Sequence, residues 1–169
     1  MSKAVLISIR PKWCEKIASG EKNVEVRKTR PNLKTPFKCY IYCTQSGGVR
    51  RLVGERGKVI GEFVCDRIDR LVRVGFDGSG EPAEYCICNY DMSVWPIDGI
   101  CEDACLTKEE LEKYLGGYEG YGWHISNLKI YDTPKELSKF TGKQNTRFGV
   151  APYEIKRPPQ SWCYVEGKP

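Results

Sequence analysis

Short β-prone runs, separated by glycine and proline, limit the fold of this chain more than any other feature. The chain has 17 glycines and 10 prolines among 169 residues, which favours turn-rich β structure over a helical bundle. β-Branched or alternating runs predict strands at residues 5–9, 23–27, 38–44, 58–65, 122–131 and 162–165. Helical patterns do not alternate with these runs, so a doubly wound parallel sheet is disfavoured.

Three short helices are expected outside the sheet. One covers residues 12–19, after Pro11. A second begins at Thr107, where Thr107 and Glu110 have capping-box spacing. A third is expected at 134–140.

Three stretches show no regular pattern. Residues 45–57, rich in glycine and arginine, are expected to form an exposed loop, and residues 142–153 a second loop. Residues 76–105 are expected to be an irregular insertion. The expected fold is therefore mixed α/β (α+β): one domain, residues 1–169, built on a small mixed β-barrel of about five to seven strands with peripheral helices.

Charge and hydropathy indicate the general class of protein. Lysine and arginine number 27 against 22 acidic residues, a net charge of +5 that is compatible with a polyanionic partner. No apolar run approaches the ~20 residues of a membrane span or the ~7–15 of a signal peptide core. A cytoplasmic protein without membrane contact is expected.

The stretch from Lys22 to Arg27 is the most informative cluster of charged residues. Strand alternation places Glu25 and Arg27 on one face and Val24 and Val26 on the other. With Lys22 at the preceding turn, two cations and a carboxylate can line one cleft, where they would suit a nucleotide's phosphate and base edge. Spacing alone favours the alternative, a solvated surface ion pair on an amphipathic strand.

Other residues could contact such a ligand. Arg10, Lys12 and Trp13 lie at a strand-to-helix corner, where a tryptophan can stack on a base or fill the interface between helix and sheet. Trp123 carries the same two interpretations. His124, the one histidine, is either a general base or an ordinary, partly exposed side chain.

Nine cysteines raise the question of metal binding. Cys86, Cys88, Cys101 and Cys105 form two close pairs that could supply four zinc thiolates, although packing is the simpler role for buried thiols. No other cofactor is expected, because no glycine-rich phosphate loop is present.

The segment 76–105 also carries apolar anchors that suit a protein partner. They are Tyr85, Tyr90, Trp95 and Ile97. The alternative is that these side chains pack onto the barrel.

Together these segments resemble an ASCH domain, a branch of the PUA-like superfamily. Residues 20–27 match its G-x-K-x-x-E-x-R signature, directly after a strand and a helix, and 58–65 and 162–165 fit its later strands. The resemblance implies a PUA-like barrel, of bacterial or phage origin, that binds RNA or a nucleotide. Taken with the residue patterns above, the contacts expected at the ligand are Arg10, Lys12, Trp13, Lys22, Glu25, Arg27, Trp123 and His124.

The resemblance also implies an enzymatic alternative. Some small ASCH-like proteins resemble acetylcytidine amidohydrolases, and others resemble ribonucleases. In the amidohydrolases the signature lysine is catalytic, and Lys22 occupies that position, but a threonine nucleophile stands where this chain has Glu25. In a hydrolase of this type Lys22 and Glu25 would form the catalytic pair. A protein-interaction module remains the third possibility.

Overall fold

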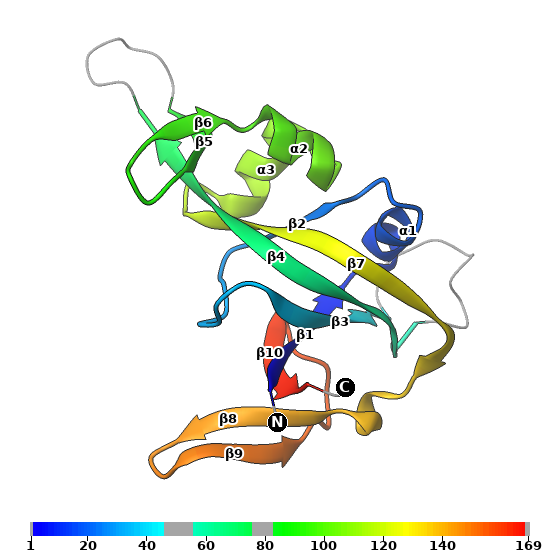
Figure 1. Cartoon of the computed structure of the whole chain (residues 1–169). Helices are drawn as coiled ribbons and strands as arrows, with labels where there is room; N and C mark the ends of the chain where they lie inside the picture. The colour runs from blue at the N-terminus through cyan, green and yellow to red at the C-terminus, as the bar shows by residue number, and fades with distance from the viewer. Residues whose placement is uncertain (1, 46–55, 76–82, 168–169) are drawn as a thin grey trace.

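The computed structural model describes residues 2–45, 56–75 and 83–167 (Figure 1). Helices and strands were expected in a mixed α+β arrangement, and this class is confirmed. The strands are β1 (Lys3–Ile9), β2 (Val24–Arg27), β3 (Phe37–Cys43), β4 (Lys58–Val74), β5 (Glu84–Cys88), β6 (Val94–Pro96), β7 (Gly120–Lys135), β8 (Thr141–Thr146), β9 (Gly149–Glu154) and β10 (Trp162–Glu166). The helices are α1 (Pro11–Ala18), α2 (Asp98–Ala104), α3 (Lys108–Leu115) and the 3-10 turn η2 (Leu137–Lys139).

The strands of the described residues form one sheet, in the order β2-β7-β4-β3-β1-β10-β8-β9, with β5 and β6 continuing from β4. Neighbours are antiparallel except β1 and β3. The path is open from β2 to β9 and has more strands than expected, so it is not the closed small barrel that the sequence suggested.

The ribbon of β4 and β7 connects the two halves of the molecule. β4 spans 17 residues and β7 spans 16, and three register shifts bend their antiparallel pairing. The first part of β4 pairs with β3 and its last part with β5, while the start of β7 pairs with β2. Figure 1 shows this ribbon crossing the molecule diagonally.

Separate apolar clusters occupy the two halves. Around β1, β3 and α1 the cluster includes Ile7, Ile41 and Phe63. At the far end of the ribbon, Val24 and Leu71 pack with α2 and α3. Burial of these faces supplies most of the driving force for folding.

Local signals explain α1 and α3. Pro11 occupies the first turn of α1, Cys14 and Ile17 are buried one turn apart, and Gly20, at a φ of 80°, follows the helix. Thr107 and Glu110 form the predicted capping box at the start of α3, with both reciprocal hydrogen bonds present. Both predicted helices are confirmed to within a residue or two.

Three other expectations differ from the structure. The described part of the 76–105 insertion, from residue 84 onward, is regular: β5, β6 and α2. The helix expected at 134–140 is the end of β7 followed by the η2 turn, and the loop expected at 142–153 is the β8–β9 hairpin. That hairpin is largely exposed, so it shows no alternation of apolar and polar residues. Most of the 45–57 loop lies outside the described residues.

Among the described residues, no helix is long and apolar enough to cross a bilayer.

Gly61 on β4 lies against the backbone of β7. A Cβ atom on Gly61 would stand 2.6 Å from the backbone oxygen of Lys129. We expect Gly61→Ala to lower the free energy of unfolding by about 1–3 kcal/mol, because backbone must move to make room. Gly99→Ala in α2 is the control: its Cβ meets nothing within 4 Å, and alanine favours a helix. Urea denaturation measures both, and equal effects would contradict the prediction.

Candidate functional site

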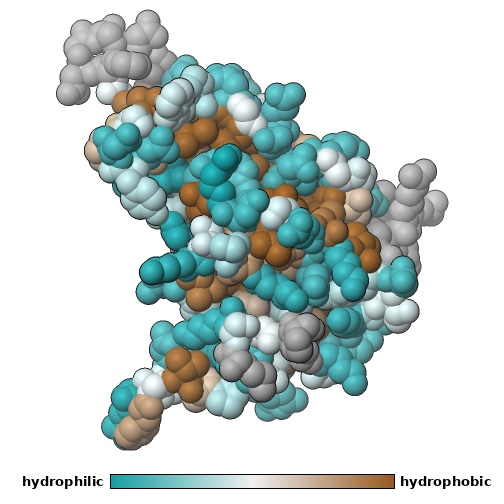
Figure 2. All heavy atoms as spheres, in the orientation of Figure 1, coloured by the Kyte–Doolittle hydropathy of each residue, from teal (hydrophilic) through white to brown (hydrophobic). Residues whose placement is uncertain are grey.

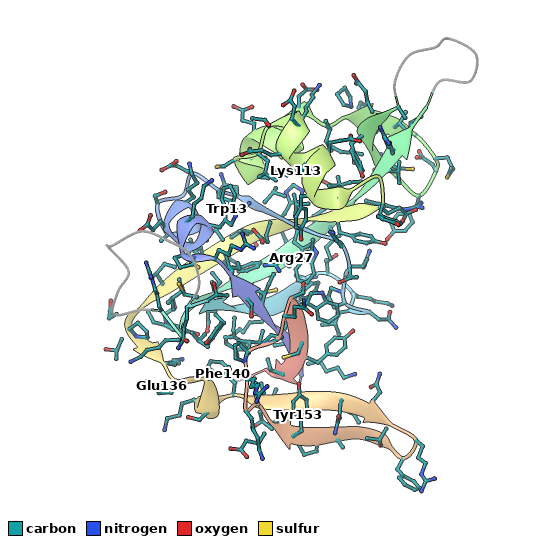
Figure 3. All side chains as sticks on the ribbon, turned by 180° about the vertical axis from the view of Figure 1, so that it is seen from behind. Trp13, Arg27, Lys113, Glu136, Phe140 and Tyr153 are labelled. Carbon is teal, nitrogen blue, oxygen red and sulfur yellow. The ribbon has the colours of Figure 1, made fainter. Side chains whose placement is uncertain are left out.

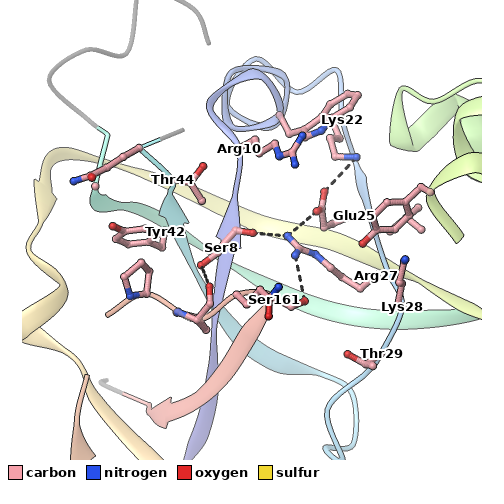
Figure 4. Close-up of a pocket in the computed structure, with 18 of the residues that line it drawn as sticks. Ser8, Arg10, Lys22, Glu25, Arg27, Lys28, Thr29, Tyr42, Thr44 and Ser161 are labelled. Carbon is pink, nitrogen blue, oxygen red and sulfur yellow. Dashed lines mark hydrogen bonds and ion pairs between the residues drawn. The ribbon is translucent and has the colours of Figure 1, made fainter. Parts of the chain in front are cut away.

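A cavity of about 1150 Å³ opens between the start of α1, strand β2, helix α3 and residues 156–161 (Figure 4). Its wall includes Arg10, Trp13, Lys22, Glu25 and Arg27. Five of the eight predicted ligand contacts therefore come together in one place.

The cavity floor is a buried ion trio. Glu25 Oε2 lies 3.3 Å from Lys22 Nζ, and Glu25 Oε1 lies 2.9 Å from Arg27 Nη2. The three side chains are only 2%, 8% and 10% exposed for Lys22, Glu25 and Arg27. Charges this deeply buried must be paired, so the surface ion pair that spacing alone also allowed is excluded.

Strand β2 places this trio because both of its faces are buried. Val24 and Val26 pack into the cluster formed with α2 and α3, and Glu25 and Arg27 face the cavity. Lys22 reaches the trio from the turn after α1, and its ammonium donates to the backbone oxygen of Ala104 at 2.8 Å. The alternation seen in the sequence thus separates the face that packs on α2 and α3 from the charged face at the cavity.

Backbone and hydroxyl groups hold Arg27 in place. Arg27 Nη2 donates to the backbone oxygen of Ser8 at 2.6 Å, and Nη1 donates to Ser161 Oγ at 3.3 Å. Ser8 Oγ donates to the backbone oxygen of Pro159 at 2.6 Å. These bonds, drawn in Figure 4, join β1, β2 and the segment before β10 around one guanidinium.

Exposed cations surround this floor. Arg10, Lys28 and Lys156 line the cavity and are exposed. With Lys22 and Arg27, five cationic side chains line the cavity against two carboxylates, Glu25 and Glu110. The cavity is therefore positive overall, with its freely accessible charges at the rim.

Three aromatic side chains line the cavity in different ways. The Trp13 ring has the ammoniums of Lys12 and Lys22 at 4.5 and 4.8 Å from its centroid. Tyr42 is buried. Tyr114 is 41% exposed, so it presents the most accessible ring of the three.

Tyr114 was missed by the sequence interpretation. Its position in α3, next to Leu115, marks it only as a residue beside the buried face of an amphipathic helix. Burial raises the pKa of Tyr114 and outweighs the opposing charges of Arg27 and Arg10. Its hydroxyl is therefore protonated at neutral pH and can donate a hydrogen bond.

The other predicted contacts lie elsewhere. Trp123 is fully buried between Phe37 and Trp162, which rules out stacking on a ligand. His124 lies on β7 with Nε2 2.6 Å from Asp69 Oδ2, beside Arg67 and away from the residues that line the cavity. Lys12 is exposed and touches the site only through the Trp13 ring.

Among the described residues, no three of the four predicted zinc ligands come together. Within the described residues, which include Cys86, Cys88, Cys101 and Cys105, no three His, Cys, Asp or Glu side chains are grouped to hold a metal ion. Cys88 and Cys101 are buried, and Cys105 Sγ donates to the backbone oxygen of Glu21. The burial of Cys88 and Cys101 fits packing as the role of these two thiols.

The apolar anchors of the insertion divide into two pairs. Tyr85 and Ile97 are buried against α2 and α3. Tyr90 and Trp95 are 99% and 58% exposed. Packing onto the rest of the molecule therefore accounts for the first pair only.

Comparison with solved structures identifies the fold. The chain is similar to the crystal structure of ASCH from Zymomonas mobilis, with 17% identity and a TM-score of 0.58 over 96% of this chain and 87% of that one. A tyrosine-to-phenylalanine variant of that protein matches with 16% identity and the same TM-score, over 98% and 91% of the two chains. The chain has the ASCH-domain fold. No protein-family model and no curated protein sequence matches it.

Glu25 is expected to be the critical charge for the stability of this ASCH-type fold. Glu25→Gln would leave Lys22 and Arg27 without their counter-charge in a buried site, and we expect it to cost about 3–5 kcal/mol of unfolding free energy. Glu21→Gln is the matched control, since Glu21 pairs with Lys16 on the exposed surface and should change stability far less. Urea denaturation of both variants tests this, and comparable losses would refute it.

The Asp69–His124 pair predicts a pH-dependent contribution to stability. Burial alone would raise the pKa of Asp69, but the hydrogen bond from His124 and the charge of Arg67 prevail, so the pKa lies below its ordinary value of 3.8. The folded state therefore favours the carboxylate, and this stabilisation is present above pH 3.8 and lost as pH falls through the lower folded-state pKa.

We expect Asp69→Asn to be less stable than the wild type near neutral pH, with the gap narrowing below about pH 4. Thermal unfolding across a pH series measures the gap. A gap that stays constant, or widens towards acid, would show that Asp69 does not act through its charge.

Proposed function

We propose that this ASCH domain binds single-stranded RNA or a nucleotide in the cavity beside β2. The observation that carries the proposal is the charge arrangement: exposed cations stand around a floor whose buried charges are already paired. Phosphate attracts such a rim through charge-assisted hydrogen bonds. The ASCH-domain fold is consistent with nucleic-acid interaction in general.

The structure suggests a division of roles different from the one expected from sequence. Lys22 and Arg27 are buried and bonded to Glu25 and to backbone oxygens, so they shape the floor. Arg10, Lys28 and Lys156 are accessible, and we assign phosphate contact to them. Tyr114, with its exposed ring, is the stacking candidate in place of Trp123.

Two polar atoms in the cavity wall favour a ligand that can both donate and accept hydrogen bonds. Among the described residues, Arg27 Nε and Thr44 Oγ1 are buried without a hydrogen-bond partner, and both residues line the cavity. Buried polar atoms are normally satisfied. The edge of a nucleobase offers acceptors for the Arg27 N–H and either kind of group for the Thr44 hydroxyl.

The hydrolase alternative receives less support from the geometry. Each carboxylate oxygen of Glu25 faces a cation, Lys22 on one side and Arg27 on the other. A carboxylate held this way is poorly placed to accept a proton from substrate or water, and its arrangement fits a positioning role. We therefore carry the binding proposal forward and keep strand cleavage as an outcome of its test.

Removing two rim cations should weaken RNA binding and its salt dependence. For Arg10→Ala/Lys28→Ala we expect lower affinity for single-stranded RNA and a slope of log affinity against log salt that is smaller by about 1.4, or about 0.7 per lost phosphate contact. Fluorescence anisotropy with RNA and DNA probes across a salt series measures both quantities.

The matched control is Lys34→Ala/Lys129→Ala, which removes the same charge from exposed positions outside the cavity wall. Equal losses of RNA affinity in both double variants would show that the effect depends only on the overall charge of the protein. Absence of wild-type binding at low salt would overturn the proposal. The same samples are run on a denaturing gel, because cleavage of the probe would favour the hydrolase instead.

A further inference from the structure

The β8–β9 hairpin projects from the body of the molecule as an arm (Figures 1 and 2). Each strand has six residues, so the arm is about 20 Å long. Between described residues, β8 joins the sheet through one register pair with β10, Gly142 opposite Val165, and β9 pairs with β8 alone. Residues 144–150 are all exposed. Most of the arm therefore contributes little to the core.

The base of the arm is nonetheless closely packed. A Cβ atom at Gly142 would lie 2.3 Å from the Tyr153 ring, so that ring lies directly against the Gly142 backbone. Tyr153, labelled in Figure 3, also belongs to the cluster that contains Phe140. The arm is thus anchored at one end and free at the other.

The tip presents an aromatic ring together with a cation. Phe148 is 87% exposed, and the Arg147 guanidinium lies 4.6 Å from its ring centroid. The turn has defined hydrogen bonds: Thr146 Oγ1 donates to the Gly149 oxygen and accepts from the Phe148 N–H. The exposed Phe148 ring does not contribute to the core, and an aromatic ring near a cation can stack on an unpaired base.

The arm continues directly into the cavity wall. After β9 the chain passes through Lys156 and Arg157 to the residues before β10 that hold Arg27. Across residues 141–157 four cations, Lys143, Arg147, Lys156 and Arg157, stand against one carboxylate, Glu154. Lys156 itself lines the cavity. Lys143 is paired with Glu166, so the remaining positive charge stands beside the cavity, at Lys156 and Arg157, and at the tip of the arm, at Arg147.

We propose that the β8–β9 arm is a second contact for single-stranded RNA, which binds the part of the strand that leaves the cavity, with a base stacked on Phe148 and phosphate beside Arg147. This rests on the proposed function of the cavity. A mononucleotide would not need a second contact of this kind. The proposal therefore implies that this ASCH domain binds a polymer in preference to a free nucleotide.

The test compares probe lengths in an arm variant. Arg147→Ala/Phe148→Ala changes two side chains that lie outside the core, and the matched control Lys129→Ala/Tyr90→Ala removes one exposed cation and one exposed ring elsewhere. Each is measured by anisotropy against single-stranded RNA of about 4 and about 16 nucleotides, which span the site sizes of small binding folds.

For the arm variant we expect unchanged affinity for the short probe and a loss of about fivefold or more for the long one, the smallest effect typical of losing one base-stacking contact. The salt slope for the long probe should fall by about 0.7. The control should leave both probes unaffected.

The outcomes separate the two proposals. Wild type that binds the short probe, with an arm variant that binds the long probe equally well, would overturn the arm and leave the cavity intact. Equal loss for both probes would also overturn the arm as a separate contact. If the wild type fails to bind either probe at low salt, the cavity proposal is overturned, and the arm's role as its second contact is overturned with it.

Discussion

One buried carboxylate organises the surroundings of the cavity. Glu25 pairs with both Lys22 and Arg27 in a buried site, where leaving any of these charges without a partner would cost stability. The two cations then extend outward to the backbone oxygens of Ala104 and Ser8 and to the hydroxyl of Ser161. These hydrogen bonds join segments that are far apart in sequence: β1, β2, the end of α2 and the residues before β10. The segments meet because each supplies a hydrogen-bond partner or a charge to the one ion trio.

The long β4–β7 ribbon gives this trio its position. β2 is short, yet both of its faces are covered, one by the α2 and α3 cluster and one by the cavity wall. Both faces of β2 can be covered because β2 pairs with the start of β7. That part of β7 extends past the central strands to the apolar cluster formed with α2 and α3. The cavity therefore lies where the two halves of the molecule meet, with rigid strands behind it and a helix and a loop at its rim.

Sequence interpretation succeeded for features that depend on residues close together in the chain. The capping box of α3, the helix after Pro11 and the two faces of β2 depend on residues a few positions apart, and each was predicted. The β8–β9 hairpin escaped because its exposure leaves no apolar face to detect. The tryptophans show the same limit: Trp13 and Trp123 looked equivalent, but only the fold separates a ring at the cavity from one enclosed by Phe37 and Trp162.

The sequence by itself determined the mixed α+β class, the order of the first elements and the identity of the Lys22, Glu25 and Arg27 cluster, since these follow from local periodicity and from one short motif. Only the tertiary structure decided that the cluster is buried and internally paired, that Tyr114 faces the same cavity, and that His124 belongs to a separate pair with Asp69. The physical reason is that burial depends on which distant segments cover a residue. Burial in turn determines whether a charge is available to a ligand or is needed to hold the fold together.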